Sequence, residues 1–425
     1  ATKPSRSIVA NTSALLCGAT ATPVGMSTGT FPKHTTAAAA FPWPPRPLRH
    51  RSSCPSLEWL RHSRGSVGIP KTPLSNGCLI STATRFELGM TSFAETHKDA
   101  STGVPIPHGE RLRNVIDEIV EAERVGLDVY GLGEHHRVDM AASAPAITLA
   151  AAAAKTERIR LSSAVIVLSS ADPVRTFQDF STLDLVSNGR AELLVGRGSF
   201  IESFPLFGYS LDDYNELFVE KLELLVELSR NEKVTWEGKF RAPLYDQAVY
   251  PRPQQDPLPI WIGVGGTPES VVRAGRLGLP LVLAIIGGDP ARFRVFADLY
   301  RRTLVESGFD PGDFPLAVHG LGFIADDNEQ ASNDIYPSFS DVMNKIGRER
   351  GWPALTREQY DWMRSPEGSL VVGDPETVAT KILYWKEVLG IDRFMLHHAG
   401  SVPHGKAMRS IELFGTEVSP RVRGA

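Results

Sequence analysis

An acidic residue and two histidines, Glu134, His135 and His136, directly follow the apolar stretch of residues 127–132. Imidazoles donate or accept protons near neutral pH, carboxylates can accept them, and imidazoles also bind metals. Neighbouring residues that leave a strand point to opposite sides, so one imidazole of the pair is expected to face a shared site. In the alternative interpretation, both histidines bond backbone carbonyls in a turn.

A glycine turn follows a second apolar stretch, residues 260–264. Gly265 and Gly266 expose backbone amides, Thr267 takes the N-cap position of a helix, and Pro268 suits its first turn. Backbone amides and a helix N-terminus together attract an anion such as phosphate. The sequence is neither a Walker loop nor a dinucleotide fingerprint, and a plain tight turn is the alternative.

Arg197 stands between Gly196 and Gly198, directly after residues 191–195. A guanidinium forks onto phosphate oxygens, and flanking glycines let a ligand approach the backbone. Alone, Arg197 could equally be a solvated loop residue. Together with the glycine turn it indicates one phosphate held from two sides.

The elements that must position these residues repeat one unit: an apolar strand, a polar loop and an amphipathic helix. A helix–Gly–strand joint recurs at Gly126, Gly278 and Gly390. Eight such strands predict an α/β fold, a (β/α)8 TIM barrel with its site at the carboxyl ends of the strands. The expected strands are residues 86–91, 129–133, 159–168, 191–195, 260–264, 279–286, 316–324 and 393–397. The expected helices are residues 109–125, 144–155, 174–186, 213–229, 268–277, 290–307, 329–347, 376–389 and 406–417.

Two connections exceed ordinary loop length, residues 231–259 and 348–370, and such insertions usually cover the mouth of a barrel. The first is expected to contain a hairpin around residues 236–240. At the carboxyl end of the last strand, His397 and His398 are expected to lie across the same mouth from His135.

Residues 1–84 differ in composition from residues 85–425, which are expected to form the barrel domain. The first segment carries nine Lys and Arg and one acidic residue and is rich in Ser, Thr, Ala and Pro, whereas the remainder has a net charge of −12. We expect it to be a disordered or targeting-like extension. The protein is then cytoplasmic, or organellar if the extension is a transit peptide.

The composition of residues 85–425 excludes several classes of partner and site. An acidic body argues against nucleic acid as a partner. All three cysteines, Cys17, Cys54 and Cys78, lie in the extension, so the barrel has no disulfide and no thiolate site. The longest run of small apolar residues, 141–154, is shorter than the ~20 residues that span a bilayer, so no membrane association is expected.

Several ordered segments together resemble the bacterial luciferase-like flavin monooxygenases, over residues 86–418. They are residues 126–136, 164–168, 172–175, 189–198 and 258–267; residues 197–204 are similar to a non-luminous, FMN-dependent branch. The family implies a barrel that uses reduced FMN and molecular oxygen to oxidise a small organic substrate. It also implies a homodimer and a flavin reductase, or NAD(P)H, as the source of reduced FMN.

The resemblance assigns roles by position. His135 matches the catalytic histidine, and Glu134 is expected to orient it. Ala164 and Val165 match a cis peptide beneath the isoalloxazine ring. Four residues are expected to bind the phosphate of the flavin: Arg197, Gly265, Gly266 and Thr267.

The chain also departs from luciferase. It has Gly196 in place of a reactive cysteine, and Gly265-Gly266 in place of a Glu-Ser pair. These differences put light emission and an aldehyde substrate in question, but not flavin binding. Three alternatives stay open: a deazaflavin (F420)-dependent oxidoreductase, a metal-dependent barrel hydrolase and a non-catalytic binding module. Because adjacent histidines diverge, we expect no metal site.

The expected boundary before residue 85 gives a first prediction. A shortened chain beginning at Ala83 should keep its melting temperature and its affinity for FMN, because all eight strands lie after this point. Thermal melting and FMN titration of both chains check this. Melting several degrees lower, or losing FMN, would show that the first segment packs on the barrel.

Overall fold

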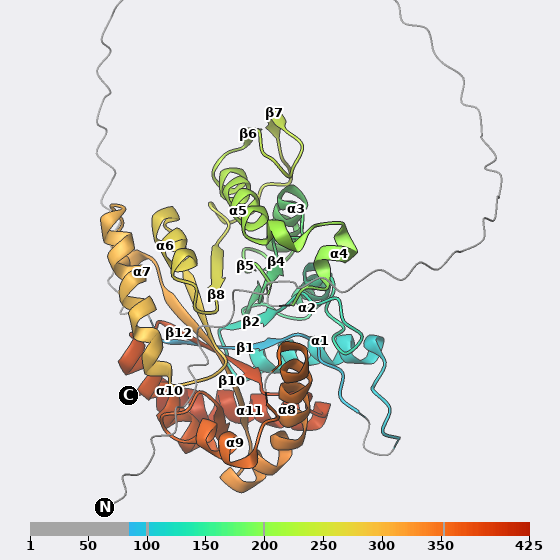
Figure 1. Cartoon of the computed structure of the whole chain (residues 1–425), viewed down its shortest axis with the longest axis vertical. Coiled ribbons are helices and arrows are strands. Elements are labelled where there is room, and N and C mark those ends of the chain that lie inside the picture. The colour runs from blue at the N-terminus through green and yellow to red at the C-terminus, as the bar shows by residue number, and fades with distance from the viewer. Residues whose placement is uncertain (1–84, 99–101, 199, 352) are drawn as a thin grey trace, which may run out of the picture. The chain divides into compact units, whose positions relative to one another are not determined.

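The computed structural model describes residues 85–98, 102–198, 200–351 and 353–425, so the expectation for residues 1–84 lies outside the described residues. Parallel strands pair side by side in a ring, and β10 closes it by pairing with both β9 and β12. The predicted (β/α)8 TIM barrel is confirmed (Figure 1). The ring consists of β1 (Glu87–Ser92), β2 (Val129–Leu132), β3 (Arg160–Ser163), β5 (Ala191–Gly196), β8 (Ile260–Val264), β9 (Leu281–Ile285), β10 (Leu316–Ile324) and β12 (Arg393–His398).

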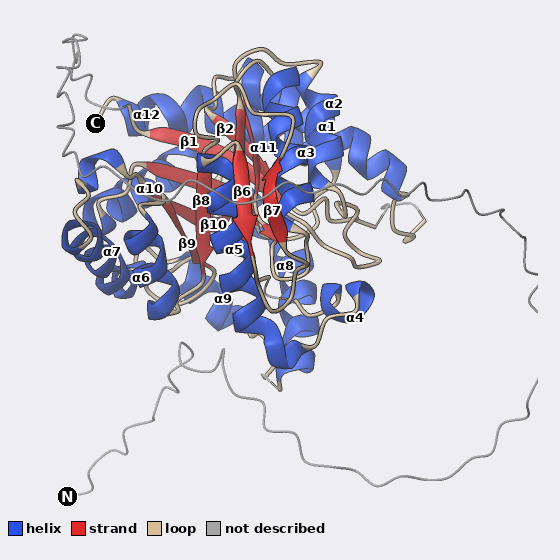
Figure 2. Cartoon of the chain, turned by 90° about the horizontal axis from the view of Figure 1, so that it is seen from above, coloured by secondary structure: helices blue, strands red, loops and turns tan. Residues whose placement is uncertain are grey.

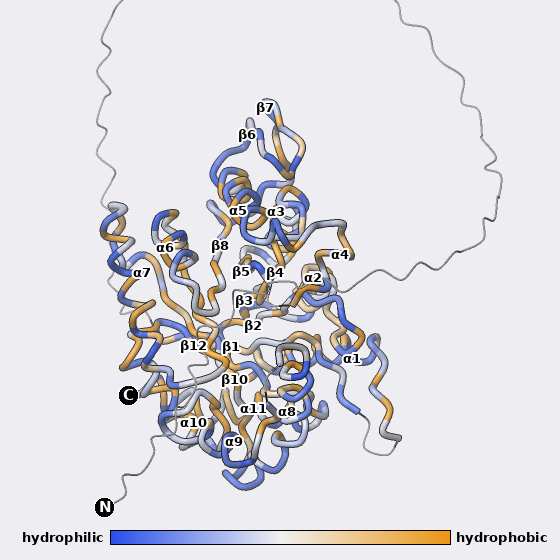
Figure 3. The backbone as a smooth tube through the Cα atoms, viewed as in Figure 1, coloured by the Kyte–Doolittle hydropathy of each residue, from blue (hydrophilic) through white to orange (hydrophobic). Residues whose placement is uncertain are grey.

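Helices surround these strands (Figure 2), and apolar residues follow the strands at the centre (Figure 3). No described helix is both long and apolar enough to cross a membrane. The helices of the repeating units are α1 (His108–Arg124), α2 (Pro145–Ala153), α3 (Pro173–Val186), α5 (Tyr214–Arg230), α6 (Pro268–Leu277), α7 (Arg294–Glu306), α8 (Asn328–Arg350), α10 (Pro375–Leu389) and α11 (His404–Leu413). A π-helical turn (Phe414–Val418) and α12 (Ser419–Arg423) end the fold.

The three helix–Gly–strand joints have the backbone conformation that requires glycine. The φ angles of Gly126, Gly278 and Gly390 are +79°, +60° and +62°, in the left-handed region. Gly278 and Gly390 are the C-cap residues of α6 and α10. A left-handed glycine stops each helix and turns the chain back toward the ring, which explains why the joint marks the repeating unit.

The prediction of one continuous strand over residues 159–168 is wrong. It is divided into β3 and a short β4 (Ile166–Val167), and both pair with β5. The peptide bond between Ala164 and Val165, which lies between them, is cis. A continuous run of apolar residues is expected for one buried strand and also for two short buried strands in succession. The hydrophobic pattern therefore could not reveal the break.

The two long connections also contain regular structure. The predicted hairpin is confirmed as the antiparallel pair β6 (Lys233–Trp236) and β7 (Leu244–Ala248). Residues 348–370, which were expected to be a loop, contain the end of α8 and all of α9 (Arg357–Arg364), and β11 (Val371–Gly373) then pairs with β10. The short helix α4 (Ser203–Phe207) was not expected.

Four charged side chains meet inside the amino-terminal end of the ring. Arg393 donates to both carboxylate oxygens of Glu192, at 2.7 and 3.0 Å, and to Glu87 at 2.7 Å. Arg160 lies 3.3 Å from Glu192. Burial alone would raise the pKa of Glu192, but the guanidiniums of Arg393 and Arg160 outweigh burial and lower it. These contacts tie β1, β3, β5 and β12 together at the floor of the barrel.

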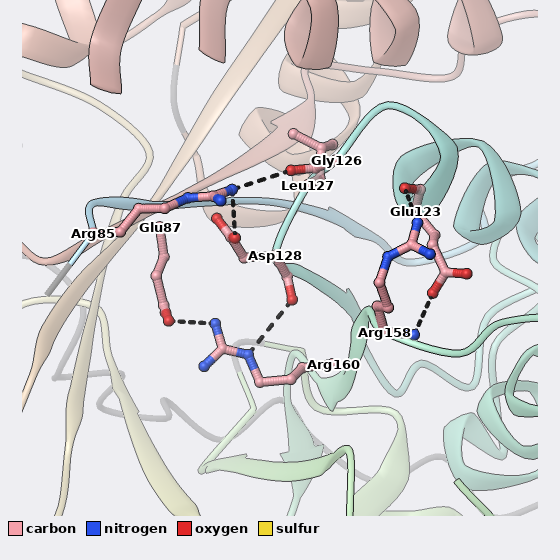
Figure 4. A pocket seen from close by; sticks show the side chains of 8 residues that line it. All are labelled: Arg85, Glu87, Glu123, Gly126, Leu127, Asp128, Arg158 and Arg160. Atoms are coloured by element: carbon pink, nitrogen blue, oxygen red, sulfur yellow. Dashed lines mark hydrogen bonds and ion pairs between the residues drawn. The ribbon is translucent and has the colours of Figure 1, made fainter. Parts of the chain in front are cut away.

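A pocket at the same end of the barrel is lined by residues at the beginnings of β1, β2 and β3 (Figure 4). Its charges are already paired: Arg85 bonds Asp128 at 3.1 Å, and the carboxylate of Glu123 accepts the backbone amide of Arg158 at 2.7 Å. It lies at the opposite end of the strands from the loops that carry His135 and Arg197. We therefore assign it to the floor of the barrel rather than to the chemistry.

The floor gives a prediction on stability. Arg393→Met leaves the carboxylate of Glu192 buried without its principal partner, so the free energy of unfolding in urea should fall by about 3–5 kcal/mol. Arg302→Met is the matched control, because the Arg302–Glu306 pair is 3.9 Å apart and its side chains are 63% and 67% exposed. The control should change stability by no more than about 0.5 kcal/mol. Equal losses in the two variants would contradict a structural role for the floor.

Candidate active site

Backbone hydrogen bonds hold the loop that follows β2 in place. The amide of Glu134 donates to the carbonyl of Val165, and that of His135 to Ala142, each at 2.9 Å. A Cβ at Gly133 would lie 2.5 Å from both the Ala164 carbonyl oxygen and the Phe93 ring. Glycine is therefore the residue that lets this loop pass between β1 and the β3–β4 break.

His135 lies in an aromatic site at the mouth of the barrel. It is 8% exposed, and its ring is 4.4 Å from Phe93 and 4.9 Å from Phe200, centroid to centroid. Its Nδ1 is 3.4 Å from a carboxylate oxygen of Glu202. Burial raises the pKa of Glu202, but the contact with His135, a backbone hydrogen bond and the nearby Arg137 together outweigh burial and lower the pKa.

The expectation that Glu134 orients His135 is wrong. One oxygen of Glu134 lies 2.8 Å from Nε2 of His136, and the other accepts the amide of Val167 at 2.9 Å. The reason is the path of the backbone, which follows the β3–β4 break and directs the carboxylate toward β4. Glu202, which sequence reasoning did not identify, takes the place beside His135. The two histidines do have different partners, as the divergence argument predicted.

Val165 projects from the break between β3 and β4 into the upper part of the barrel. A Cβ at either Gly196 or Gly263 would lie 3.0 Å from the Val165 side chain. Two glycines, on β5 and β8, thus make room for this one valine. The same close packing favours glycine at position 196, because a larger side chain there would press against Val165.

Arg197 and the glycine turn lie together, as predicted. The guanidinium of Arg197 donates to Thr267 Oγ1 at 2.8 Å and to Asn215 Oδ1 at 2.6 Å. Thr267 is the N-cap of α6, but its side chain makes no capping hydrogen bond. Gly266 has φ +122°, and a Cβ on Gly265 would meet no atom within 4 Å. This turn therefore has open space, a helix N-terminus and a guanidinium fixed at one side, which fits a phosphate group.

A second polar group lies on β1 and β12. His397 Nε2 is 2.8 Å from a carboxylate oxygen of Glu95, and its Nδ1 is 3.0 Å from Thr91 Oγ1. Burial raises the pKa of Glu95, but the contact with His397, a backbone hydrogen bond and the guanidinium of Arg111 together outweigh burial and bring the pKa to about 2. His398 points elsewhere, toward Ser410 of α11 at 3.2 Å. Only His397 of this pair thus joins the mouth.

Sequence reasoning missed Glu95, Phe93 and His319 as residues of the mouth. The ring of Phe93 is 4.4 Å from His397 as well as from His135. His319 on β10 is 5.2 Å from His397. Glu95 could have been found from the sequence, because it is a polar residue just beyond the end of a predicted strand. His319 lies in the middle of an apolar strand, where the sequence gives no such signal.

The described residues contain no group of three or more His, Cys, Asp or Glu side chains placed to hold a metal ion. A family model for luciferase-like monooxygenases matches residues 86–393.

The chain belongs to the luciferase-like monooxygenase family.

Relatives in this family differ in the cofactor that their names specify. The N-acetyl-S-alkylcysteine monooxygenase of Bacillus subtilis is 31% identical over 312 residues, covering 68% of this chain and 89% of the relative. The F420-dependent glucose-6-phosphate dehydrogenase of Amycolatopsis mediterranei is 25% identical over 335 residues, covering 73% and 95%. The oxygenating constituent of 3,6-diketocamphane monooxygenase from Pseudomonas putida, solved with FMN, has a TM-score of 0.63 at 19% identity, covering 79% and 98%. The proteins similar to this chain thus include one named as F420-dependent and one solved with FMN.

The Glu95–His397 contact predicts a pH dependence of stability. Glu95 has a folded pKa below its unfolded value, so its contribution is complete above pH 4.5 and is lost as the pH falls toward 2. Glu95→Gln should lower the free energy of unfolding at pH 7 by about 2 kcal/mol. The difference from the native chain should shrink at pH 4 and below, as urea unfolding at several pH values will measure. A difference that stays constant with pH would contradict this ionised contact.

Proposed function

We propose that this protein is an FMN-dependent monooxygenase, which uses reduced FMN and molecular oxygen to oxidise a small organic substrate. The observation that carries the proposal is the position of Arg197. Its guanidinium is fixed by Thr267 and Asn215 beside the open glycine turn, at the end of the strands where His135 also lies.

The residues would divide the binding of FMN between its two ends. Arg197 and the Gly265-Gly266-Thr267 turn would hold the phosphate through charge-assisted and backbone hydrogen bonds. Ala164 and Val165, at the β3–β4 break, would support the ring system. Reduced flavin supplies the electrons that activate oxygen, and the protein supplies binding, orientation and shielding.

His135 is the group that would move a proton. An imidazole side chain can both donate and accept a proton in general acid–base catalysis. Glu202 at 3.4 Å from Nδ1 would orient the ring and leave Nε2 for the reacting atoms. Phe93 and Phe200 pack against the ring and keep water from it, which protects reactive species from hydrolysis.

The second candidate is an F420-dependent oxidoreductase, which would transfer a hydride without using oxygen. It is favoured by the F420-dependent relative, which is matched over 95% of its length. We favour FMN because four relatives of this chain are named as monooxygenases. Reduced FMN would come from a separate flavin reductase or from NAD(P)H, and we expect the protein to act as a homodimer.

The phosphate site can be tested by removing its guanidinium. Arg197→Met should weaken FMN binding by about 10- to 100-fold, the value of a charge-assisted hydrogen bond, and should leave riboflavin binding unchanged. Arg294→Met is a suitable control, because Arg294 is 68% exposed on α7. Calorimetric titration of the three proteins with FMN, riboflavin and F420 measures this. Equal affinity of the native chain for FMN and riboflavin would remove the phosphate site, and preference for F420 would favour the second candidate.

The two adjacent histidines give a matched pair of variants. His135→Ala should keep FMN binding but reduce turnover by about 100-fold or more, the scale of lost acid–base catalysis. His136→Ala should be milder, because His136 bonds Glu134 on the far side of the loop. Re-oxidation of bound reduced FMN by oxygen, followed by its absorbance, provides the assay. A larger effect for His136→Ala would reverse the assignment.

A further inference from the structure

The residues proposed to bind FMN occupy one half of the mouth. They lie on or just after β3, β5 and β8, which are consecutive in the ring. The opposite half is formed by β10, β12 and β1, which are also consecutive and lead back through β2 to the first half. Three polar side chains of this second half, Glu95, His319 and His397, have no part in the proposed cofactor site.

His319 is unusual among them because its polar atoms have no partner. Both ring nitrogens are shielded from solvent, and neither has a hydrogen-bond partner among the described residues. The residue as a whole keeps intermediate exposure. A buried nitrogen without a partner loses its hydrogen bonds to water and gains none in return, and native proteins rarely leave such atoms unpaired.

The charge state of His319 decides what it can bind. Burial first, and then the neighbouring His397, lower the pKa of His319 to about 3. The imidazole is therefore neutral at pH 7, with one N–H donor and one nitrogen acceptor. It offers directional hydrogen bonds but no positive charge.

His397 cannot take the same role, because both of its nitrogens are occupied. Thr91 lies at Nδ1 and Glu95 at Nε2. The pKa of Glu95, about 2, keeps a carboxylate anion beside this half of the mouth. The titratable groups that adjoin His319 are His397 from β12 and Glu95 from the β1 loop, and Arg111 of α1 contacts Glu95 in turn. The charged group nearest His319 is thus a carboxylate, which would repel a negatively charged ligand.

An aromatic ring, Phe93, lies between His319 and His135. The Phe93 ring stacks on His319 at a centroid distance of 6.5 Å with 18° between planes, and it also touches His135 at 4.4 Å. Phe93 thus separates the proposed proton carrier from the unpartnered imidazole. A ligand bonded to His319 would extend along the Phe93 ring toward His135.

We propose that His319 binds the organic substrate, and that this substrate is an uncharged molecule with an apolar body and a hydroxyl or carbonyl oxygen. The proposal rests on the proposed function, which places the cofactor in the other half of the mouth. His319 acts as a binding and specificity residue, and His135 remains the proton carrier.

The experiment compares four probes with one ring and different polar groups: cyclohexanol, cyclohexanone, methylcyclohexane and cyclohexanecarboxylate. Their affinities for the full chain, with and without FMN, are measured by saturation-transfer NMR. The variants are His319→Leu, which removes the hydrogen bonds, and His319→Asn, which retains a donor and an acceptor. FMN affinity is measured in parallel for every protein.

We expect the ratio of the affinities of cyclohexanol and methylcyclohexane to fall about tenfold in His319→Leu, the value of one net hydrogen bond, and to recover in His319→Asn. The native chain should bind the carboxylate more weakly than the alcohol. An unchanged ratio, tighter carboxylate binding, or no binding of any oxygen-bearing probe would overturn the proposal. Failure of the native chain to bind FMN would instead overturn the proposed function, while the probe ratios measured without FMN would still decide the role of His319.

Discussion

Closure of the ring between β1 and β12 is the constraint on which the candidate site depends. These strands pair in parallel from Glu87 against Arg393 up to Thr91 against His397. At the lower end, closure brings Arg393 to Glu87 and Glu192. At the upper end it brings His397 to Thr91, about three hundred residues away in sequence. One register therefore sets both the charged floor and the polar half of the mouth.

The interior of the barrel is filled by different kinds of side chain at its two ends. The floor contains long charged side chains that satisfy one another, with Arg393 also lying 4.3 Å from the Trp261 ring. The upper part contains glycines and the small residues of the β3–β4 break, so that Val165 fits between Gly196 and Gly263. The charged floor ties the strands together, whereas the glycines of the upper part make room for Val165 of the β3–β4 break.

Much of the barrel could be predicted from the sequence, because buried parallel strands and left-handed glycine joints leave strong patterns. Arg197 and Thr267 could be paired because each directly follows a strand of the same sheet. The break at Ala164-Val165 could not be derived from the apolar pattern, and only the family resemblance pointed to it. The partner of Glu134 depended on a backbone path that spacing does not record. His319 was missed because its importance comes from what surrounds it after closure.

The most direct test of the account is a crystal structure of the full chain with FMN. We predict the phosphate at the turn of Gly265, Gly266 and Thr267, within hydrogen-bond distance of Arg197, and the ring system against Ala164 and Val165 with His135 at its edge. FMN bound at the floor pocket beside Arg85, or a phosphate with no contact to Arg197, would contradict it.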